Sequence, residues 1–305
     1  MWLFFTLATT FIWGLAELFY KKGARPDEKY SHLKIVVCVG VVMGIHAIYT
    51  LLTSDMGYNP MNLICYFPVS FCYILSMALS YFGMRFIEES ISDPIENTSG
   101  AICALLCVVI LHERLELPSI IAIGLMFIGI LGIGFLDNNG DTDRKKVLGK
   151  KMAIVAFMMP FCYAILDALG TFLDDITLEM STTHLVNVTE DTIETVANTS
   201  YELTFLICAL LILAFLLFKK VKFDLPNQKD KIIAAICETG GQFTYVYALS
   251  GGHGAIAAPI MSCVCVVSLI LSRIFLKEKL TKLQYVFIFI IILGILTLAI
   301  IEGDA

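Results

Sequence analysis

Apolar stretches of membrane-spanning length alternate with short polar linkers along almost the whole chain. A helix needs about 20 mainly apolar residues to cross the hydrocarbon core of a bilayer, and ten stretches approach or reach this length. They are Trp2–Tyr20, Leu33–Leu52, Leu63–Met84, Pro94–Leu111, Pro118–Leu136, Met152–Leu173, Tyr201–Phe218, Ile232–Leu249, Ala255–Leu276 and Leu283–Ile301. The pattern predicts an all-α integral membrane protein with ten transmembrane helices.

The composition favours the same fold class over a soluble protein. Hydrophobic residues make up 58% of the 305-residue chain and charged residues only 16%, with a mean hydropathy of +0.82. A soluble domain carries about 25% charged residues. The stretch Trp2–Tyr20 lacks the basic start and the small-residue cleavage site of a signal peptide, so we expect it to be the first span. We expect membrane lipid around the protein and no nucleic-acid partner.

The ten cysteines all fall within apolar stretches, and no Cys-x-x-Cys pair occurs. Cys103 and Cys107 share a helix face at a spacing of four, which is the pairing that could suit a metal. Free cysteines in such surroundings usually behave as small core residues. We therefore expect neither a metal site nor a cofactor.

One sequence pattern occurs twice in the chain, 165 residues apart. Pro94 opens an apolar stretch that ends in Leu-His-Glu-Arg-Leu at 111–115, and Pro259 opens one that ends in Leu-Lys-Glu-Lys-Leu at 276–280. The apolar stretch after each hinge carries a glycine, Gly129 in the first copy and Gly294 in the second. All these spacings agree without a gap, which predicts an internal repeat.

This pattern resembles the EamA-like branch of the drug/metabolite transporter superfamily, whose members carry two five-helix halves that each end in a hinge of this kind. The resemblance implies one half over residues 1–136, a connector over 137–150 and a second half over 151–301. Because five is an odd number, the halves would insert with opposite orientation, as two inverted five-helix repeats. Such repeats suit alternating access around a site near the middle of the membrane.

The basic residues are distributed very unevenly among the linkers. Of the 21 lysines and arginines, 20 flank odd-numbered linkers, and only Arg114 lies in an even-numbered one. Cytoplasmic loops carry the excess of Lys and Arg in membrane proteins. The distribution therefore predicts a cell-membrane protein with both termini outside, together with the long acidic loop 172–200. Members of the resembled family are usually drawn with both termini inside.

Ionisable side chains within spans are costly and are the first candidates for a functional site. Glu17 in the first span and Asp167 in the sixth occupy equivalent places, because an offset of 150 aligns Trp13 with Tyr163 and Glu17 with Asp167. In the related small multidrug resistance proteins, two such glutamates bind protons and cations in exchange. Glu17 also lies four residues before Lys21, so it could instead reach the interface and pair with that lysine. Both interpretations stay open.

Glu96 and Asn97 begin a polar run in the first turns of the fourth span. Carboxylates are stabilised near a helix N-terminus by the helix dipole and the free N–H groups. Glu96 could therefore be a capping residue, but we expect both side chains to line the cavity.

The eighth span carries a polar stripe at a spacing of i, i+4, i+7, formed by Glu238, Gln242 and Tyr245. The resemblance implies a central cavity lined by the first, third and fourth helices of each half, which includes this eighth span and the third span with Tyr81. A packing role is the alternative for the tyrosine. The expected substrate- or proton-binding residues are thus Glu17, Tyr81, Glu96, Asn97, Asp167, Glu238, Gln242 and Tyr245.

These observations predict a secondary transporter that moves a small organic solute, such as a metabolite, an amine or a drug-like molecule, across the plasma membrane, with protons as a candidate coupling ion. Acids without a basic residue deep in any span favour an amine or a cation over an anion, which would call for a central Lys or Arg. No Gly-x4-Gly-Lys-Ser/Thr run is present, so we expect gradients to supply the energy.

A passive channel or a divalent-cation permease that uses the same acids as a ring is the alternative. We do not expect an enzyme, because the sequence shows neither His-Glu-x-x-His nor a Ser/His/Asp set within one membrane depth. A monomer is compatible with the two-half architecture.

The charge distribution generates a test of orientation. A membrane-impermeant cysteine reagent should label a cysteine introduced into loop 172–200 in intact cells, because this loop contains no Lys or Arg. Labelling that requires permeabilised cells would reverse the orientation and leave the fold unaffected.

Overall fold

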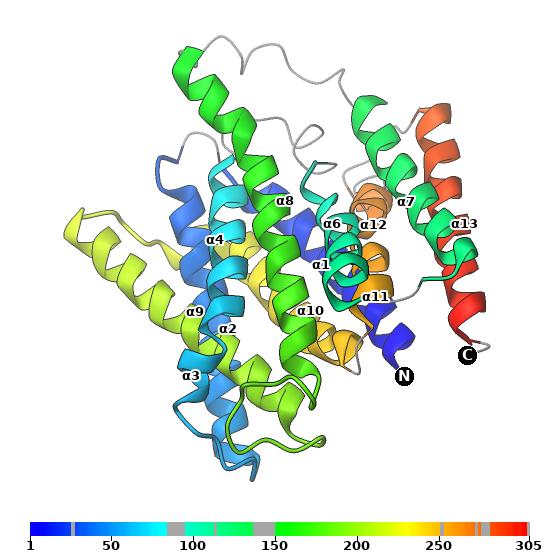
Figure 1. The fold of residues 1–305 in the computed structure, drawn as a ribbon. Helices are drawn as coiled ribbons and strands as arrows, with labels where there is room; N and C mark the ends of the chain where they lie inside the picture. Colours follow the sequence, from blue (N-terminus) through cyan, green and yellow to red (C-terminus); the bar gives the residue numbers. More distant parts are fainter. Residues whose placement is uncertain are drawn as a thin grey trace.

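The computed structural model describes residues 1–25, 28–83, 95–112, 115–136, 150–250, 253–271, 274–275 and 281–303. Over these residues the chain is helical and contains no strand. Figure 1 shows the helices as a bundle, with the two termini near the same end. Three residues that define the predicted repeat, Pro94, Glu113 and Glu278, lie outside the described residues, as does nearly all of the predicted connector 137–150.

The helices follow the predicted apolar stretches closely. Their bounds are α1 Trp2–Gly23, α2 Ser31–Thr53, α3 Asn62–Cys65, α4 Phe67–Gly83, α6 Ser99–Leu106, η1 Cys107–Leu111, α7 Leu117–Leu136, α8 Lys150–Leu178, α9 Ile193–Phe218, η3 Leu225–Gln228, α10 Lys229–Leu249, α11 Gly254–Met261, α12 Val264–Leu271 and α13 Lys282–Gly303. Within the described part of the chain, four segments are long and apolar enough to cross a membrane: α1, α2, α9, and α11 with α12. Four shorter apolar helices join them, over 67–83, 99–111, 117–132 and 282–297. The fold is that of a multi-pass membrane protein.

The predicted long loop Phe172–Ser200 is wrong in its bounds. Helix α8 continues to Leu178 and α9 begins at Ile193, so only residues 179–192 connect them. The last turns of α8 carry two acids, Asp174 and Asp175, which lower the local hydropathy although both are buried. Hydrogen-bonding partners on other helices allow these acids to be buried, and hydropathy cannot register such partners.

Three predicted spans are interrupted: Leu63–Met84 by a turn at Tyr66 between α3 and α4, and the two spans of the repeated segment. The stretch Ala255–Leu276 contains two helices, α11 and α12, with a turn at Ser262–Cys263 between them. Pro259 in α11 has no N–H to donate to the carbonyl of Ala255, which weakens the helix just before that turn. The stretch Pro94–Leu111 is also broken, because a turn at 97–98 precedes α6. The turns at 97–98 and Ser262–Cys263 lie 165 residues apart.

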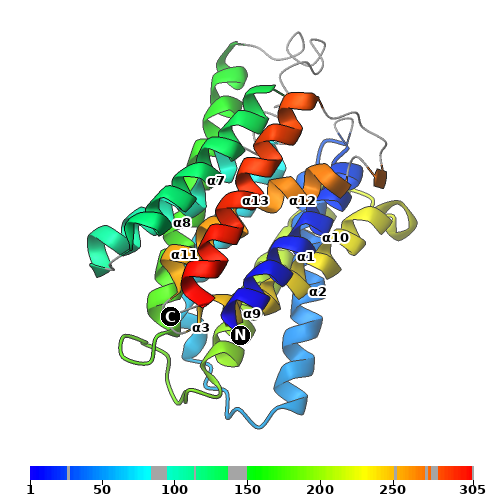
Figure 2. The ribbon, with the colours of Figure 1, turned by 90° about the vertical axis from the view of Figure 1, so that its right-hand side faces the viewer.

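The helices pack in pairs that cross between the two halves of the chain. Helix α1 lies along α10, α4 along α8, α2 along α9, α6 against α11, and α7 along α13. Figure 2 shows α7 and α13 side by side. Partners in each pair are far apart in sequence, so the two halves are interleaved rather than separate bodies.

The α7–α13 pair is held together by a reciprocal glycine contact. A Cβ on Gly129 would lie 2.4 Å from Cγ1 of Ile291, and one on Gly294 would lie 2.6 Å from Cγ of Met126. Met126 and Ile291 are themselves 165 residues apart, as are the two glycines. Each helix thus presents the same glycine-and-large-residue unit to the other, and small residues of this kind allow close helix approach in membranes.

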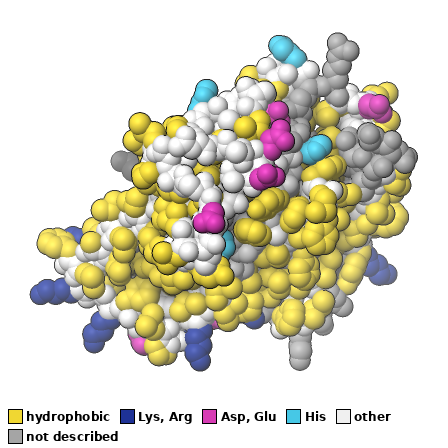
Figure 3. All heavy atoms as spheres, turned by 90° about the horizontal axis from the view of Figure 1, so that it is seen from below, with side chains coloured by type: hydrophobic (Ala, Val, Ile, Leu, Met, Phe, Trp, Pro, Cys, Tyr) yellow, Lys and Arg dark blue, Asp and Glu magenta, His cyan; other side chains and the backbone are white. Residues whose placement is uncertain are grey.

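The two ends of the bundle differ in charge. At one end, loop 179–192 is tied to α3 by Asn62, whose side chain donates to the carbonyl of Val186 at 3.1 Å and accepts from its N–H at 2.7 Å. The exposed acids Asp55, Glu190 and Asp191 lie at this end. We call it the acidic end. Figure 3 looks onto it and shows acidic side chains across the face, with the visible Lys and Arg side chains at its margin.

At the opposite end, one acid joins two buried lysines. Glu28 in the α1–α2 linker pairs with Lys34 of α2 and lies 3.0 Å from Nζ of Lys231 at the start of α10. Lys34 and Lys231 are 5% and 1% exposed. Burial opposes the charged form of Glu28, but the hydrogen bonds from Lys34 and Lys231 outweigh it and hold the pKa of Glu28 below its usual value.

The glycine contact predicts a localised sensitivity to one methyl group. Gly129→Ala should destabilise the protein by about 1–3 kcal/mol, because the new Cβ overlaps Ile291 and lies 3.2 Å from the carbonyl oxygen of Phe287. Gly124→Ala is the matched control in the same helix, since a Cβ there meets nothing within 4 Å. The melting temperature of the purified protein measures both. Equal melting temperatures for the two variants would contradict the contact.

The Glu28 cluster predicts a pH-dependent stability. Glu28→Gln should cost about 3 kcal/mol near neutral pH, because two buried lysines lose their carboxylate. The depressed pKa means that this stabilisation is present above the unfolded-state pKa and is lost as the pH falls through the folded-state value. The melting-temperature gap between wild type and variant should therefore narrow in acid. Asp224→Asn, at an exposed acid nearby, should show no such gap.

Candidate functional site

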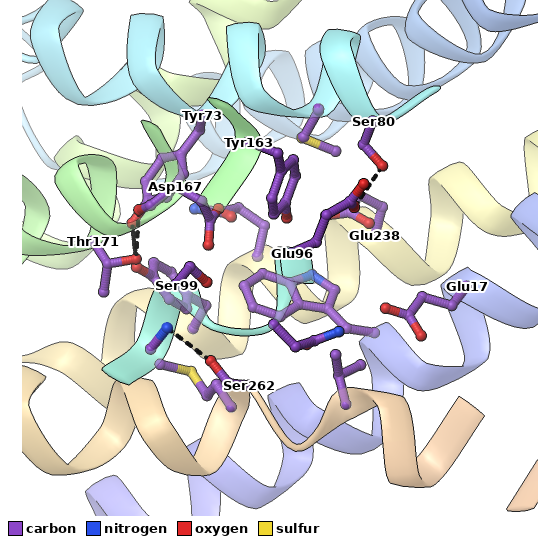
Figure 4. A pocket seen from close by; sticks show the side chains of 18 of the residues that line it. Glu17, Tyr73, Ser80, Glu96, Ser99, Tyr163, Asp167, Thr171, Glu238 and Ser262 are labelled. Atoms are coloured by element: carbon purple, nitrogen blue, oxygen red, sulfur yellow. Dashed lines mark hydrogen bonds between the residues drawn. The ribbon is translucent and has the colours of Figure 1, made fainter. Parts of the chain in front are cut away.

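A pocket of about 140 Å³ lies at the centre of the bundle. Its walls come from α1, α4, α8 and α10, from the turn 97–98 with the start of α6, and from the turn between α11 and α12, with Tyr201 added from α9. Figure 4 shows the side chains converging on it from these segments. The first, third and fourth predicted spans of each half thus contribute to one cavity.

The structure brings together every residue expected from the sequence. The lining includes Glu17, Tyr81, Glu96, Asn97, Asp167, Glu238, Gln242 and Tyr245. Sequence reasoning missed Ser99, Thr171, Tyr201 and Ser262 as lining residues. Tyr201 was placed at the start of a span because the first turns of α9 are polar, and Ser262 lies at a helix interruption that hydropathy does not reveal.

Four carboxylates face the pocket from four different segments (Figure 4). The hydroxyl of Ser80 donates to Oε2 of Glu96 at 2.7 Å, and that of Tyr20 donates to Oε2 of Glu238 at 3.3 Å. The carboxyl of Asp167 faces Ser99 and Tyr163. No Lys or Arg occurs among the described residues that line the cavity. Neutral hydroxyl groups thus donate to Glu96 and Glu238, and the described lining presents acidic groups to a cation that enters.

Aromatic rings supply most of the remaining wall. Six tyrosines and Trp13 line the pocket, and the ring centroids of Trp13 and Tyr245 lie 5.1 Å apart and those of Tyr20 and Tyr81 5.0 Å apart. The faces of such rings attract cations through their quadrupole. Carboxylates combined with aromatic faces are the chemistry of an amine or ammonium site.

The pocket is closed toward the acidic end by a cluster of hydroxyl groups. Tyr73 of α4 is hydrogen-bonded to Tyr245 of α10, and it donates to Oγ1 of Thr171 on α8 at 3.2 Å. All three residues are buried. We call this cluster, Tyr73, Thr171 and Tyr245, the tyrosine closure, because it joins three wall helices between the pocket and loop 179–192.

One hydrogen bond joins two of the interrupted spans at the pocket. The backbone N–H of Gly100 in α6 donates to Oγ of Ser262 at 3.0 Å (Figure 4). A Cβ on Gly100 would lie 2.1 Å from that Oγ and 2.5 Å from the carbonyl oxygen of Ala258, so only glycine permits this approach. The contact fixes α6 against α11 at the turn between α11 and α12.

The described part of the chain contains no group of three or more His, Cys, Asp or Glu side chains arranged to hold a metal ion. Cys103 and Cys107, the pairing that the sequence offered, are both buried and free in the apolar core. They lie in a core cluster with Phe172 and Ala255.

Comparison with known proteins gives a family and a fold. The model of the EamA-like transporter family matches residues 1–135 and 189–300. No curated protein matches the sequence. Among 28 solved chains that match, one described as "Crystal structure of protein" superposes with a TM-score of 0.72 at 10% sequence identity, over 98% of this chain and 96% of its own length. At that identity the likeness shows the fold alone.

Proposed function

Because the chain belongs to the EamA-like transporter family, we propose that it is a secondary transporter that moves a small cationic or amine-bearing solute through the central pocket by alternating access. The family match supports a membrane transporter of small solutes, which is not an enzyme. The cationic or amine substrate class is inferred from the lining of the pocket, which has four carboxylates and no Lys or Arg among its described residues.

The volume of the cavity limits the size of the solute. A volume of about 140 Å³ is close to that of an engineered cavity of about 150 Å³ in another protein, which holds one benzene molecule. A metabolite or an amine of that size fits this volume, whereas a drug-sized molecule requires expansion of the pocket. We therefore favour a small amine over a bulky drug.

Two inverted five-helix repeats, over residues 1–136 and 151–301, provide the mechanism in this proposal. Three observations support them: the reciprocal contact of Gly129 and Gly294, the helix interruptions 165 residues apart, and the pairing of α1 with α10 and of α4 with α8. If the two halves are exchanged, the glycine contact maps onto itself, each turn maps onto the other, and the α1–α10 pair maps onto the α4–α8 pair. Two related halves give inward-open and outward-open states of similar energy.

The orientation that we propose follows the charges. Both described termini and loop 179–192 lie at the acidic end, and the Glu28 cluster with its lysines lies at the other. The positive-inside rule then places the acidic end outside the cell membrane. Solute would move between that side and the cytoplasm, and protons are the coupling ion that the buried acids suggest.

A passive channel or divalent-cation permease is the second candidate, since the same acids could form a selective ring. The tyrosine closure argues against a continuously open pore. The two functions differ in kinetics: a transporter in liposomes shows saturable uptake and counter-exchange of labelled solute, whereas a channel shows neither.

A thermal-shift screen of the purified protein tests the substrate class directly. Polyamines, amino acids, purines and small cationic compounds should be compared with sugar phosphates and dicarboxylates. A ligand that binds only the folded protein raises its melting temperature by mass action. Shifts confined to anions would reject the proposal.

The pocket predicts a separation of coupling from binding in one variant. Glu238 is buried, lines the pocket and accepts a hydrogen bond from the hydroxyl of Tyr20, so it is placed to exchange a proton with the cavity. Glu238→Gln should abolish uptake driven by a pH gradient in proteoliposomes, while counterflow of the ligand found by thermal shift at symmetric pH persists.

The exposed acid Glu190 supplies the control, since Glu190→Gln should keep both activities. Unchanged rate and unchanged pH dependence in Glu238→Gln would remove Glu238 from coupling. The role would then pass to Glu17 or Glu96.

A further inference from the structure

A buried carboxylate lies outside the pocket, on the far side of the tyrosine closure. Asp174 is 0% exposed and accepts a hydrogen bond on Oδ1 from the hydroxyl of Tyr66, which lies between α3 and α4. Its other oxygen, Oδ2, is also buried and has no hydrogen-bond partner. A buried carboxylate oxygen without a partner carries a desolvation cost of several kcal/mol when the group is charged.

Other buried acids of the bundle are matched by a donor or a cation. Both oxygens of Glu202 on α9 lie 2.8 Å from Nδ1 of His46 on α2. Asp175 accepts the backbone N–H of Gly254 at 2.9 Å, at the first turn of α11. Asp174 differs from these acids, because its second oxygen is left for a ligand that the described residues do not supply.

The groups around Asp174 come from several neighbouring segments, and the titratable His253 adjoins Gly254, whose N–H donates to Asp175. Tyr66 precedes α4, Asp175 adjoins on α8, and the tyrosines of α4, α9 and α10 stand within electrostatic range; these last are Tyr73, Tyr201 and Tyr245. Asp167 lies seven residues earlier on the same face of α8, and Thr171 of the tyrosine closure lies between the two acids.

The position of Asp174 relates it to closure of the pocket. Its bond with Tyr66 ties the start of α4 to the end of α8, on the side of loop 179–192. It lies seven residues along α4 and three along α8 from the contact of Tyr73 with Thr171. If α4 separates from α8 at the acidic end, both contacts break and water reaches the carboxyl. Asp174 is thus sealed in the closed form and hydrated in the open one.

We propose that Asp174 is a proton-binding site of the outer closure, separate from the solute pocket, which holds a proton when the acidic end is closed and releases it when that end opens. The proposal rests on the transporter function proposed above. On closing, Oδ2 forms an O–H bond with a proton taken from hydronium at the acidic end. On opening, that bond breaks, the proton returns to water, and the carboxylate is solvated. Low pH therefore favours the closed form.

Infrared difference spectroscopy of the full-length protein tests the protonation itself. A buried protonated carboxyl gives a C=O stretching band above the amide I region, and this band shifts in D₂O. At neutral pH the wild type should show such a band that Asp174→Asn lacks, whereas Asp191→Asn, at an exposed acid of the same end, should retain it. Identical wild-type and Asp174→Asn spectra in this region would overturn the proposal.

A thiol probe tests the link to opening. A cysteine replacing Leu178, which is 2% exposed one turn beyond Asp174, reports access from the acidic end. N-ethylmaleimide labelling, quantified on the peptide that contains residue 178, avoids any need to remove the native cysteines. Labelling is compared at each pH between Leu178→Cys alone and Leu178→Cys with Asp174→Asn, so that the thiol's own pH dependence cancels.

As the pH rises, Leu178→Cys alone should be labelled more than Leu178→Cys with Asp174→Asn. The ratio of the two should grow by up to about tenfold per pH unit, which is the limit for one linked proton. Equal labelling at every pH would also overturn the proposal. Thermal shifts by amines that persist in Asp174→Asn, together with loss of the infrared band, separate this site from the solute pocket. Loss of amine binding in the wild type would instead reject the proposed function and leave the protonation result standing.

Discussion

A carboxylate in a membrane interior must be matched by a cation, by hydrogen-bond donors or by a proton, because hydrocarbon solvates charge so poorly. The way in which each acid of this bundle is matched distinguishes its role. Glu28 has two lysines and ties the α1–α2 linker to α2 and α10, whereas Glu202 has His46 and joins α2 to α9. In the pocket, hydroxyl groups donate to Glu96 and Glu238, and all four acids line the cavity that a solute would occupy.

Close helix packing makes that arrangement possible. Glycines stand where helices from the two halves meet: a Cβ on Gly14 would lie 2.5 Å from Cγ1 of Val267, and one on Gly40 would lie 2.5 Å from Cβ of Ala209. Lipid tails give apolar helices little reason to associate, so close packing of small residues supplies much of the attraction.

Much of the fold and of the pocket could be predicted from the sequence. Apolar stretches located the helices, and the rarity of ionisable groups within them identified Glu17, Glu96, Asp167 and Glu238 as residues that line one cavity. Asp174 was not predicted to be buried, because hydropathy scores a carboxyl as polar regardless of its partners. The end of α8 was therefore assigned to a predicted loop. Tyr66, the residue that makes its burial possible, lies 108 residues away in the sequence.

The hydrogen bond between Gly100 and Ser262 bears on how a two-part protein of this kind can move. It crosses between the halves at the level of the pocket, and near the centre of a rocking body displacements are smallest. Contacts at either end must lengthen when that end opens, but a central contact only turns. Under the mechanism proposed above, this contact, where the glycine admits no side chain, would let the two halves tilt in either direction while they stay joined at the pocket.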